Sequence, residues 1–244
     1  MTQQKKQQRK SGKIGHLHFS DGNSKFQQVN FPDTKDECEL FLANTFLNKA
    51  RELNTFETEN LSLLQNEQDE FDFILNIDGI QKSLELKELH LPGFKGNFEI
   101  MPEGYNCYTY AKYIFDKIIM KNSIRYGNIK GLYLLMYTTH YKFTLNNTVL
   151  NLLQYWTLIE NNNFERIFYY RPTKMSELYR IKPYPATLNS KEHFITEFNP
   201  ELYKENVCIN FDSNDMTIIK NKNKTFHCIS PDVPIELIEK LKKG

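Results

Sequence analysis

The chain lacks the features that mark several classes of protein. Its four cysteines form no CxxC pair, which argues against a zinc site and a disulfide framework and suits a reducing cytoplasm. No stretch approaches the roughly 18 consecutive apolar residues of a membrane-spanning helix, and the polar N-terminus has no signal-peptide core. We therefore expect a cytoplasmic protein that does not associate with membranes.

Catalytic motifs of several enzyme classes are missing as well. The chain contains no Gly-rich phosphate loop, no GxSxG and no HExxH, which argues against nucleotide-driven motors, serine hydrolases and zinc proteases. His16, His18 and His140 have no third ligand at the spacing of a metal site. The formal net charge is only +1, so the overall charge does not indicate a nucleic-acid partner.

The composition that remains is that of a soluble globular protein. Hydrophobic residues make up 40% of the 244 residues and charged ones 25%, which fits one domain with a sizeable core. Lys and Arg crowd residues 1–14 with no acidic residue among them, so a basic, disordered tail is expected there. A single domain then covers residues 15–244, with its core at about 34–170 and a C-terminal elaboration at 171–244.

The first long element is a helix expected from Thr34 to about Asn54. Thr34 and Glu37 have the spacing of a capping box, in which side chains satisfy free backbone N–H groups of the first turn. Apolar residues recur after it at helical spacing and define the stripe that should be buried. These are Leu42, Ala43, Phe46, Ala50 and Leu53.

Segments that favour helices and strands alternate along much of the chain, which predicts an α/β fold with helices on the faces of a mixed sheet. Helices are expected at 105–122 and 147–161, strands at 16–20, 25–31, 131–137 and 164–170, later extended segments at 207–211, 216–219 and 225–229, and a short terminal helix from Pro234.

Residues 71–89 predict a β-hairpin, because Asp78-Gly79 is a strong two-residue turn signal between alternating strands. In that register Phe73 faces Leu84 and Phe71 faces Leu86, which makes one apolar face. On the other face Asp72 lies opposite Glu85, and Glu70 opposite Lys87. A one-residue slip would set Phe side chains against charges, whereas a two-residue slip would make Asp72 and Glu85 diagonal neighbours.

The opposed carboxylates of Asp72 and Glu85 carry the chemical hypothesis. Their Cβ atoms should be about 4.5–5.5 Å apart, a spacing at which like charges repel each other. A divalent cation between them would replace this repulsion with attraction of both carboxylates to the ion. Mg²⁺ typically takes one or two protein carboxylates and leaves the remaining positions to water and phosphate. Lys87 follows on the same face; in the structural alternative it merely pairs with Glu70.

Asp72 followed by Glu85-Leu86-Lys87 resembles the D…(D/E)xK signature of the PD-(D/E)XK nuclease superfamily. Phe71 stands where the family name has proline, a position that varies widely in the family. The resemblance covers residues 34–137 and extends towards 170. It implies a restriction-endonuclease-like mixed central sheet flanked by helices, and hydrolysis of phosphodiester bonds with Mg²⁺ or Mn²⁺.

Further site residues and partners are implied by the same resemblance. Many members add a glutamate from the preceding helix, for which Glu39 is the candidate, and a Lys or Gln from a later helix, for which Lys112 and Gln154 are candidates. The implied substrate is nucleic acid, with double-stranded DNA expected, in restriction or anti-invader defence, acting as a homo-oligomer or with a partner subunit. Apart from the resemblance, Lys220, Lys222 and Lys224 alternate in an expected hairpin loop, where they would hold backbone phosphates or form a plain exposed turn.

The role expected for Lys87 is electrostatic, since neighbouring carboxylates favour its charged form and so oppose a role as general base. Two other functions stay open at this point. One is a non-catalytic nucleic-acid-binding or scaffold subunit that keeps the nuclease fold, against which the complete set of Asp72, Glu85 and Lys87 argues. The other is an RNA-processing or repair nuclease, which would use the same site.

Overall fold

The computed structural model describes most of the chain outside its two ends. The described residues are 12–18, 24–66, 71–89, 104–125, 131–140, 143, 145–160, 162–172, 177–182, 198–204, 207–210, 216–221 and 224–229. Several expected features lie outside these ranges: residues 1–11 of the tail, Glu70, Lys222 and the helix from Pro234.

A mixed sheet of six strands forms the centre of the molecule, with the order β3-β4-β5-β7-β8-β9. Strands β5, β7 and β8 run parallel to one another, while β3, β4 and β5 form an antiparallel meander and β9 pairs antiparallel with β8. The expected mixed sheet with flanking helices is therefore confirmed. The bounds are β3 Leu61–Gln65, β4 Phe73–Ile77, β5 Ile80–Glu88, β7 Leu132–Tyr137, β8 Phe164–Arg171 and β9 Glu177–Lys182.

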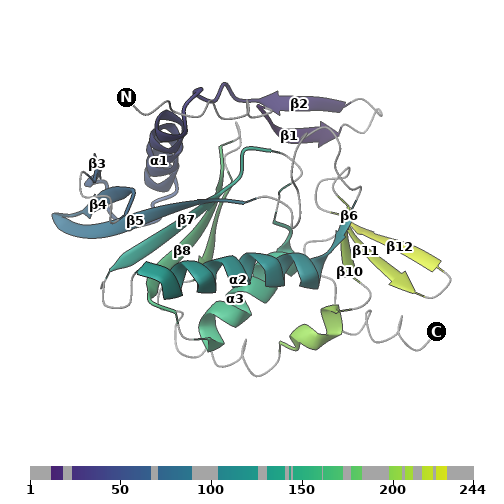
Figure 1. Ribbon diagram of the computed structural model, residues 1–244. Coiled ribbons are helices and arrows are strands. Elements are labelled where there is room, and N and C mark those ends of the chain that lie inside the picture. The colour runs from purple at the N-terminus through teal and green to yellow at the C-terminus, as the bar shows by residue number, and fades with distance from the viewer. Residues whose placement is uncertain are drawn as a thin grey trace, which may run out of the picture.

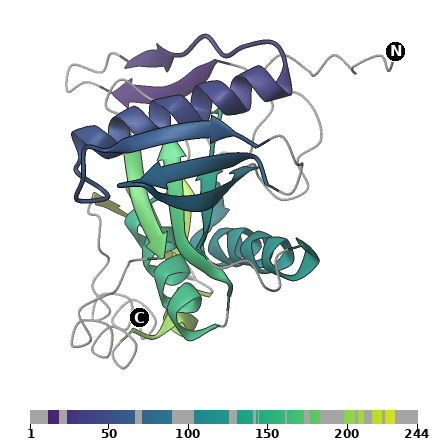
Figure 2. The same cartoon turned by 90° about the vertical axis from the view of Figure 1, so that its left-hand side faces the viewer.

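Three helices pack against this sheet: α1 Lys35–Glu52, α2 Cys107–Arg125 and α3 Asn147–Ile159. Figure 1 shows α1 on one side of the sheet and α2 and α3 on the other, and Figure 2 shows α1 lying across the strands. Both faces are thus covered, which explains why all residues of β7 are buried and why its sequence is almost wholly apolar.

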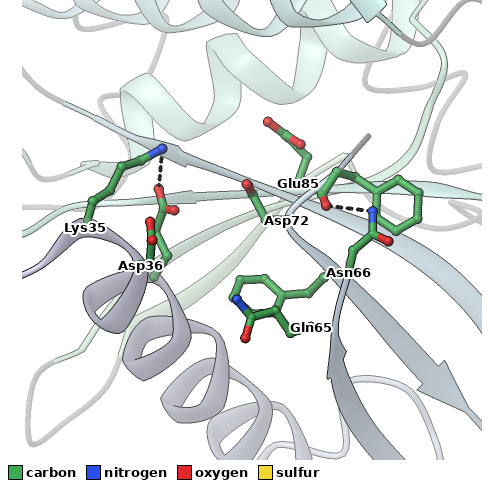
Figure 3. A pocket seen from close by; sticks show the side chains of 9 residues that line it. Lys35, Asp36, Gln65, Asn66, Asp72 and Glu85 are labelled. Atoms are coloured by element: carbon green, nitrogen blue, oxygen red, sulfur yellow. Dashed lines mark hydrogen bonds and ion pairs between the residues drawn. The ribbon is translucent and has the colours of Figure 1, made fainter. Parts of the chain in front are cut away.

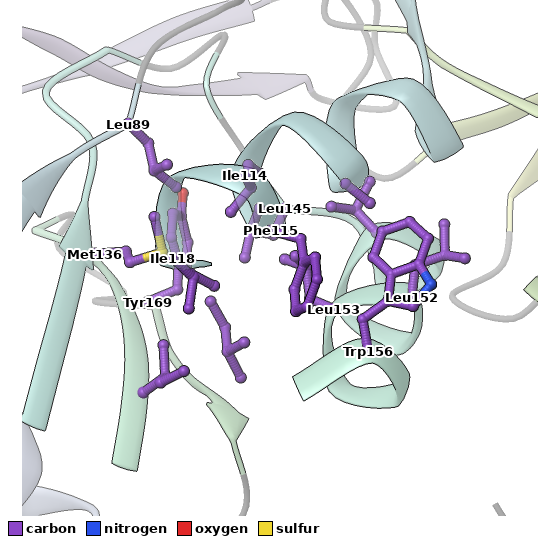
Figure 4. Packing of buried hydrophobic residues seen from close by; sticks show 14 of the residues in the cluster. Leu89, Ile114, Phe115, Ile118, Met136, Leu145, Leu152, Leu153, Trp156 and Tyr169 are labelled. Carbon is purple, nitrogen blue, oxygen red and sulfur yellow. The ribbon is translucent and has the colours of Figure 1, made fainter. Parts of the chain in front are cut away.

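The core is divided by the sheet into two clusters. On the α1 side, Leu42 and Phe46 pack with Leu84, Leu86 and neighbouring aromatic residues. On the other side, α2 and α3 pack over alternate residues of the same strands, as Figure 4 shows. Labelled there are Leu89, Ile114, Phe115, Ile118, Met136, Leu145, Leu152, Leu153, Trp156 and Tyr169.

Helix α1 begins where the sequence predicts, with Thr34 as its N-cap. The Thr34 hydroxyl accepts a hydrogen bond from the Glu37 N–H at 3.3 Å and donates one to the Glu37 carboxylate at 2.7 Å. Four of the five expected stripe residues are buried, but the expectation for Leu53 is wrong: it is 50% exposed. Leu53 is the C-cap, so it lies past the last turn that packs on the sheet.

Two smaller sheets flank this core. Strands β1 (Lys13–His18) and β2 (Ser24–Gln28) pair antiparallel, so the first strand begins just inside the segment expected as tail. A four-stranded sheet has the order β12-β11-β10-β6. Its strands are β6 Gly104–Asn106, β10 Val207–Asn210, β11 Met216–Asn221 and β12 Lys224–Ile229, and a 3₁₀ helix spans Pro200–Tyr203.

Strands β3 and β9 are the main additions to the expected fold, and both lie at edges of the central sheet. Only Leu61 of β3 is fully buried, and only Ile181 of β9. Such strands have little apolar alternation, which is why the pattern of the sequence does not mark them. Within the residues described here, no helix is long and apolar enough to cross a bilayer.

Candidate active site

The expected hairpin register is present between β4 and β5. Phe73 pairs with Leu84 and Ile77 with Ile80, so the strands are joined by the two-residue turn Asp78-Gly79. Both turn residues have positive φ, 51° at Asp78 and 83° at Gly79, as a type I′ turn requires. The alternative two-residue slip is therefore excluded.

Asp72 lies in a bend immediately before β4, and not within the strand as expected. Its Oδ2 accepts a hydrogen bond of 2.7 Å from the Leu86 backbone N–H. The strand partner of Leu86 would have been Phe71, but the chain has already left the ladder there. The Asp72 carboxylate thus serves as an acceptor where pairing with β4 ends, and this fixes its position beside β5.

The expectation for Phe71 is corrected by the same bend. Phe73, Leu84 and Leu86 are buried beneath α1, as expected, but Phe71 is only half-buried and lines a pocket. Because the backbone turns before β4 begins, the alternation of faces that would have buried Phe71 does not extend to it.

Glu85 points away from the α1 side of β5. In the parallel pairing it is the partner of Leu134, which packs beneath α2, and the flanking Leu84 and Leu86 face α1. Its side chain is only 5% exposed and forms an ion pair with Lys121 of α2. A carboxylate with so little water needs such a partner, or a cation in its place.

A pocket of about 410 Å³ joins these elements. Figure 3 shows Asp72 and Glu85 beside the first turn of α1 and the end of β3. Glu39 also lines this pocket, where its carboxylate lies 3.5 Å from the Lys35 ammonium. The lining residues are Lys35, Asp36, Glu39, Gln65, Asn66, Phe71, Asp72, Phe73 and Glu85.

The electrostatics of Asp72 match the geometry. Burial raises the pKa of the Asp72 carboxyl above its usual value, and the nearby Glu85 carboxylate raises it further. The hydrogen bond from the Leu86 N–H and the positive charges of Lys121 and Lys35 oppose this rise without cancelling it. Two carboxylates thus lie close enough to repel each other, in a site where water is scarce.

Lys87 lies on the same strand face as Glu85 and is half-buried. Its pKa is lowered, first by burial and then by the positive charges of Lys121 and Lys117, while Glu85 opposes the shift. Glu85 favours the charged form of Lys87, as expected, but burial and the two lysines outweigh it, so the net shift of the Lys87 pKa is downward. Glu70, the partner of Lys87 in the structural alternative, lies outside the described residues.

The donor set available to a metal is small. Among the residues that the structure describes, no group of three or more His, Cys, Asp or Glu side chains is arranged to hold an ion. A cation between Asp72 and Glu85 would therefore have two protein carboxylates and complete its shell with water and substrate oxygens. Mg²⁺ is commonly bound in this way.

The later-helix candidates are not brought to the pocket. Lys112 is half exposed, pairs with Asp116 at 3.0 Å and lies over the Trp156 ring. The Gln154 side chain donates a hydrogen bond of 2.9 Å to the Arg180 carbonyl oxygen. Lys112 and the residue that does reach the site, Lys121, are nine positions apart on α2, which places them on opposite sides of the helix at about 100° per residue.

The expected loop at 220–224 is shorter than the sequence indicated. Lys220 belongs to β11 and Lys224 to β12, with Asn221 paired to Lys224, and Lys222 is outside the described residues. Both strands belong to the four-stranded sheet, whereas Asp72 and Glu85 lie at the central one. The backbone of Lys220 and Lys224 thus belongs to a different sheet from the two carboxylates.

Several residues at the site were not predicted, namely Lys35, Gln65, Asn66, Lys117, Lys121 and Tyr137. Lys117 and Lys121 have a sequence signal, since they are four residues apart on an amphipathic helix. Gln65 and Asn66 have none, because they lie at the end of an edge strand that the sequence does not mark. Tyr137 is buried on β7, and burial together with Glu88 and Glu39 raises its pKa.

The chain was compared with protein-family models, with curated proteins and with solved structures, and none of these comparisons found a match.

Proposed function

We propose that this protein is a metal-dependent nuclease of the PD-(D/E)XK type, which hydrolyses phosphodiester bonds in DNA with Mg²⁺ or Mn²⁺. One observation carries the proposal: the hairpin register puts Asp72 beside Glu85 at the mouth of a pocket, with Lys87 on the face of Glu85. In a hairpin with a purely structural role, two neighbouring carboxylates would cost stability through their repulsion and through the burial of one of them.

The two carboxylates fit a divalent cation. Burial and the charge of Glu85 raise the pKa of Asp72, and a divalent cation bound to both carboxylates would oppose this rise. Oxygen ligands of this kind suit Mg²⁺ or Mn²⁺ and not softer metals. A bound cation would supply Lewis-acid stabilisation of the phosphate charge and make a water molecule more acidic.

The chain's own residues supply position and charge. The Leu86 N–H donates a hydrogen bond to one oxygen of Asp72, and the other oxygen would bind a ligand in the pocket that Asp72 lines. The Lys87 ammonium, on the face of Glu85, would bind a phosphate oxygen and stabilise the negative charge that grows in the transition state. Glu39 lines the pocket from α1, where it would orient a water molecule.

The order of elements supports the same proposal. Helix α1, the β3–β4–β5 meander, helix α2 and strand β7 follow one another, with α1 and α2 on opposite faces of the sheet. This is the order that the resemblance implies for a restriction-endonuclease-like core. DNA as substrate and a role in restriction or anti-invader defence follow from the same resemblance and belong to the proposal. A cytoplasmic location also belongs to the proposal and rests on the unpaired pattern of the four cysteines and the polar N-terminus.

A second candidate function has one observation in its favour. Glu85 already has a protein counter-ion in Lys121, which is how a site that has lost its metal would be stabilised. The protein would then be a non-catalytic nucleic-acid-binding or scaffold subunit. The two candidates differ in whether a divalent cation displaces Lys121 from Glu85.

A cleavage assay separates them. Supercoiled plasmid, linear duplex, single-stranded DNA and RNA would each be incubated with the protein in Mg²⁺, in Mn²⁺ and in EDTA. The nuclease proposal expects cleavage of DNA that requires the cation and is abolished in Glu85→Gln. The control is Asp116→Asn, the same kind of change in an exposed residue that pairs with Lys112. Absence of cleavage from every substrate would favour the scaffold subunit, and cleavage of RNA alone the RNA-processing alternative.

A further inference from the structure

Three lysines converge on the α2 side of Glu85. Lys121 pairs with the Glu85 carboxylate, Lys87 follows Glu85 on the same strand face, and Lys117 lies one helical turn before Lys121. The Lys117 ammonium lies 5.2 Å from the centre of the Tyr113 ring, one further turn back on the same side of α2. We name Lys87, Lys117 and Lys121 the lysine ridge.

The charges of the lysine ridge are close enough to affect one another. Lys87 is two residues from Glu85 on one strand face, Glu85 contacts Lys121, and Lys117 is about 6 Å from Lys121 along the helix axis. Three cations therefore share a region where Glu85 is the one carboxylate in an ion pair with them among the described residues. Such an excess of like charge costs folding stability, and a polyanion would relieve it.

Lys112 shows what an ordinary lysine on this helix does. It pairs with Asp116, which lies one turn along, and its amine lies over the Phe115 and Trp156 rings. The structure gives Lys117 only the Tyr113 ring and no carboxylate within the described part of the chain. Five residues separate the two lysines, a rotation of about 140° around the helix, so they face different surroundings.

We infer that the lysine ridge binds the backbone phosphates of a nucleic-acid strand, which runs along α2 from Lys117 to the carboxylate pair. This rests on the proposed function for the identity of the ligand. The ridge is elongated, since Lys117 and Lys121 are about 6 Å apart along the helix axis. An extended polyanion would contact both lysines, whereas a single small anion would contact only one of them. Contacts of this kind hold a strand in register without reading its sequence.

Lys117 and Lys121 differ in whether they can bind phosphate before a metal ion is bound. Lys121 is occupied by Glu85 in the protein as described, whereas Lys117 is free to meet phosphate at once. A cation that binds Glu85 takes over the neutralisation of that carboxylate and frees Lys121 for the strand. Lys117 therefore contributes to binding without metal, and Lys121 contributes only with it.

The test compares Lys117→Ala with Lys112→Ala by fluorescence anisotropy, using labelled duplex and single-stranded oligonucleotides over a series of salt concentrations. In EDTA, Lys117→Ala should weaken binding about eightfold at 0.1 M monovalent salt and reduce the salt slope by about 0.9 for duplex or 0.7 for single strands. Lys112→Ala should bind as the wild type does. Neither residue supports the sheet, and thermal melting would verify that both variants are folded.

Lys121→Gln completes the experiment. Its affinity should fall by a larger factor in Ca²⁺ than in EDTA, because only a bound cation frees the Lys121 ammonium for the strand. Equal affinities and salt slopes for Lys117→Ala and Lys112→Ala would overturn the proposed binding of phosphates by the lysine ridge, even if the wild type cleaves DNA. A selective loss in Lys117→Ala would support it, even if no substrate is cleaved, so the two proposals fail separately.

Discussion

Lys121 on α2 and Glu85 on β5 form an ion pair across the interface between helix and sheet. The side chain of Glu85 is 5% exposed and that of Lys121 is 27% exposed, so Glu85 is the more buried member of the pair. This contact neutralises the carboxylate that the metal hypothesis needs. Under the proposed function a divalent cation would compete with Lys121 for the Glu85 carboxylate, which makes Lys121 the most informative residue to change.

Removal of Lys121 should make the protein less stable and more responsive to metal. In EDTA, Lys121→Ala leaves the Glu85 carboxylate buried without its partner, and we expect a loss of about 1–3 kcal/mol in the free energy of unfolding. Mg²⁺ should restore more of this stability than it adds to the wild type, because the cation replaces the missing ammonium. Urea titrations with and without Mg²⁺ measure both quantities.

Lys112→Ala is the control for that experiment, since its ion pair with Asp116 is about half exposed on both sides. Exposed pairs of this kind contribute about 0–1 kcal/mol, so the variant should melt close to the wild type. If Mg²⁺ stabilises Lys121→Ala no more than it stabilises Lys112→Ala, the cation does not bind at Glu85.

Substitution of Asp72, Glu85 or Lys87 should remove activity without unfolding the protein. Glu85→Gln, Asp72→Asn and Lys87→Ala should each lower the rate of DNA cleavage in Mg²⁺ by at least about 100-fold, because each removes a charge that acts on the transition state. Initial rates on supercoiled plasmid measure this effect. Cleavage at the wild-type rate in any of the three variants would show that the site lies elsewhere.

Much of the hairpin could be predicted from the sequence because its determinants are local. Asp78-Gly79 selects a two-residue turn, and the alternation of Leu84 and Leu86 with the charged Glu85 and Lys87 indicates which face packs against α1. The prediction failed at Phe71, where the chain leaves the strand. That departure depends on how the segment after β3 meets β4, which no periodic pattern reports.

The surroundings of Glu85 could not be predicted to the same degree. Whether Lys112 or Lys121 reaches the strand depends on the rotation of α2 on the sheet, which packing against α3 and β7 decides. Asn66 reaches the pocket from the end of β3, where only Leu61 is fully buried. Local sequence therefore predicted that Asp72 and Glu85 lie close together, and tertiary packing selected the side chains around them.

Truncation of a core residue should test the hairpin as a scaffold. Leu84 is fully buried under α1 and neighbours Glu85, so Leu84→Ala should cost about 2–5 kcal/mol of stability. Leu64→Ala is the matched control, since Leu64 on β3 is half exposed and its loss should change stability by no more than about 0.5 kcal/mol. Similar urea midpoints for the two variants would contradict the register that buries Leu84.

The stability of the metal-free protein should depend on pH through Asp72. Its pKa is raised on folding, so the native state binds this proton more tightly than the unfolded chain does. The contribution is therefore fully present below the pKa of the unfolded chain and is lost as the pH rises through the raised native value. In EDTA, the free energy of unfolding of Asp72→Asn relative to wild type should increase across that interval. A difference that stays constant with pH would show that Asp72 is not titrating in this environment.

Added metal should stabilise the wild type and leave Asp72→Asn nearly unchanged. An ion that binds only the native state adds RT ln(1 + [L]/Kd), which is about 2.7 kcal/mol when the metal is at 100 times its Kd. The asparagine can still accept the hydrogen bond from the Leu86 N–H, so the backbone position is kept while the charge is lost. Without metal this variant should be at least as stable as wild type at neutral pH, because the repulsion from Glu85 is gone. Melting curves in EDTA, Mg²⁺ and Mn²⁺ measure these shifts. Equal metal-induced shifts in both proteins would mean that the cation binds away from the carboxylate pair, and the scaffold function would then be favoured over the nuclease.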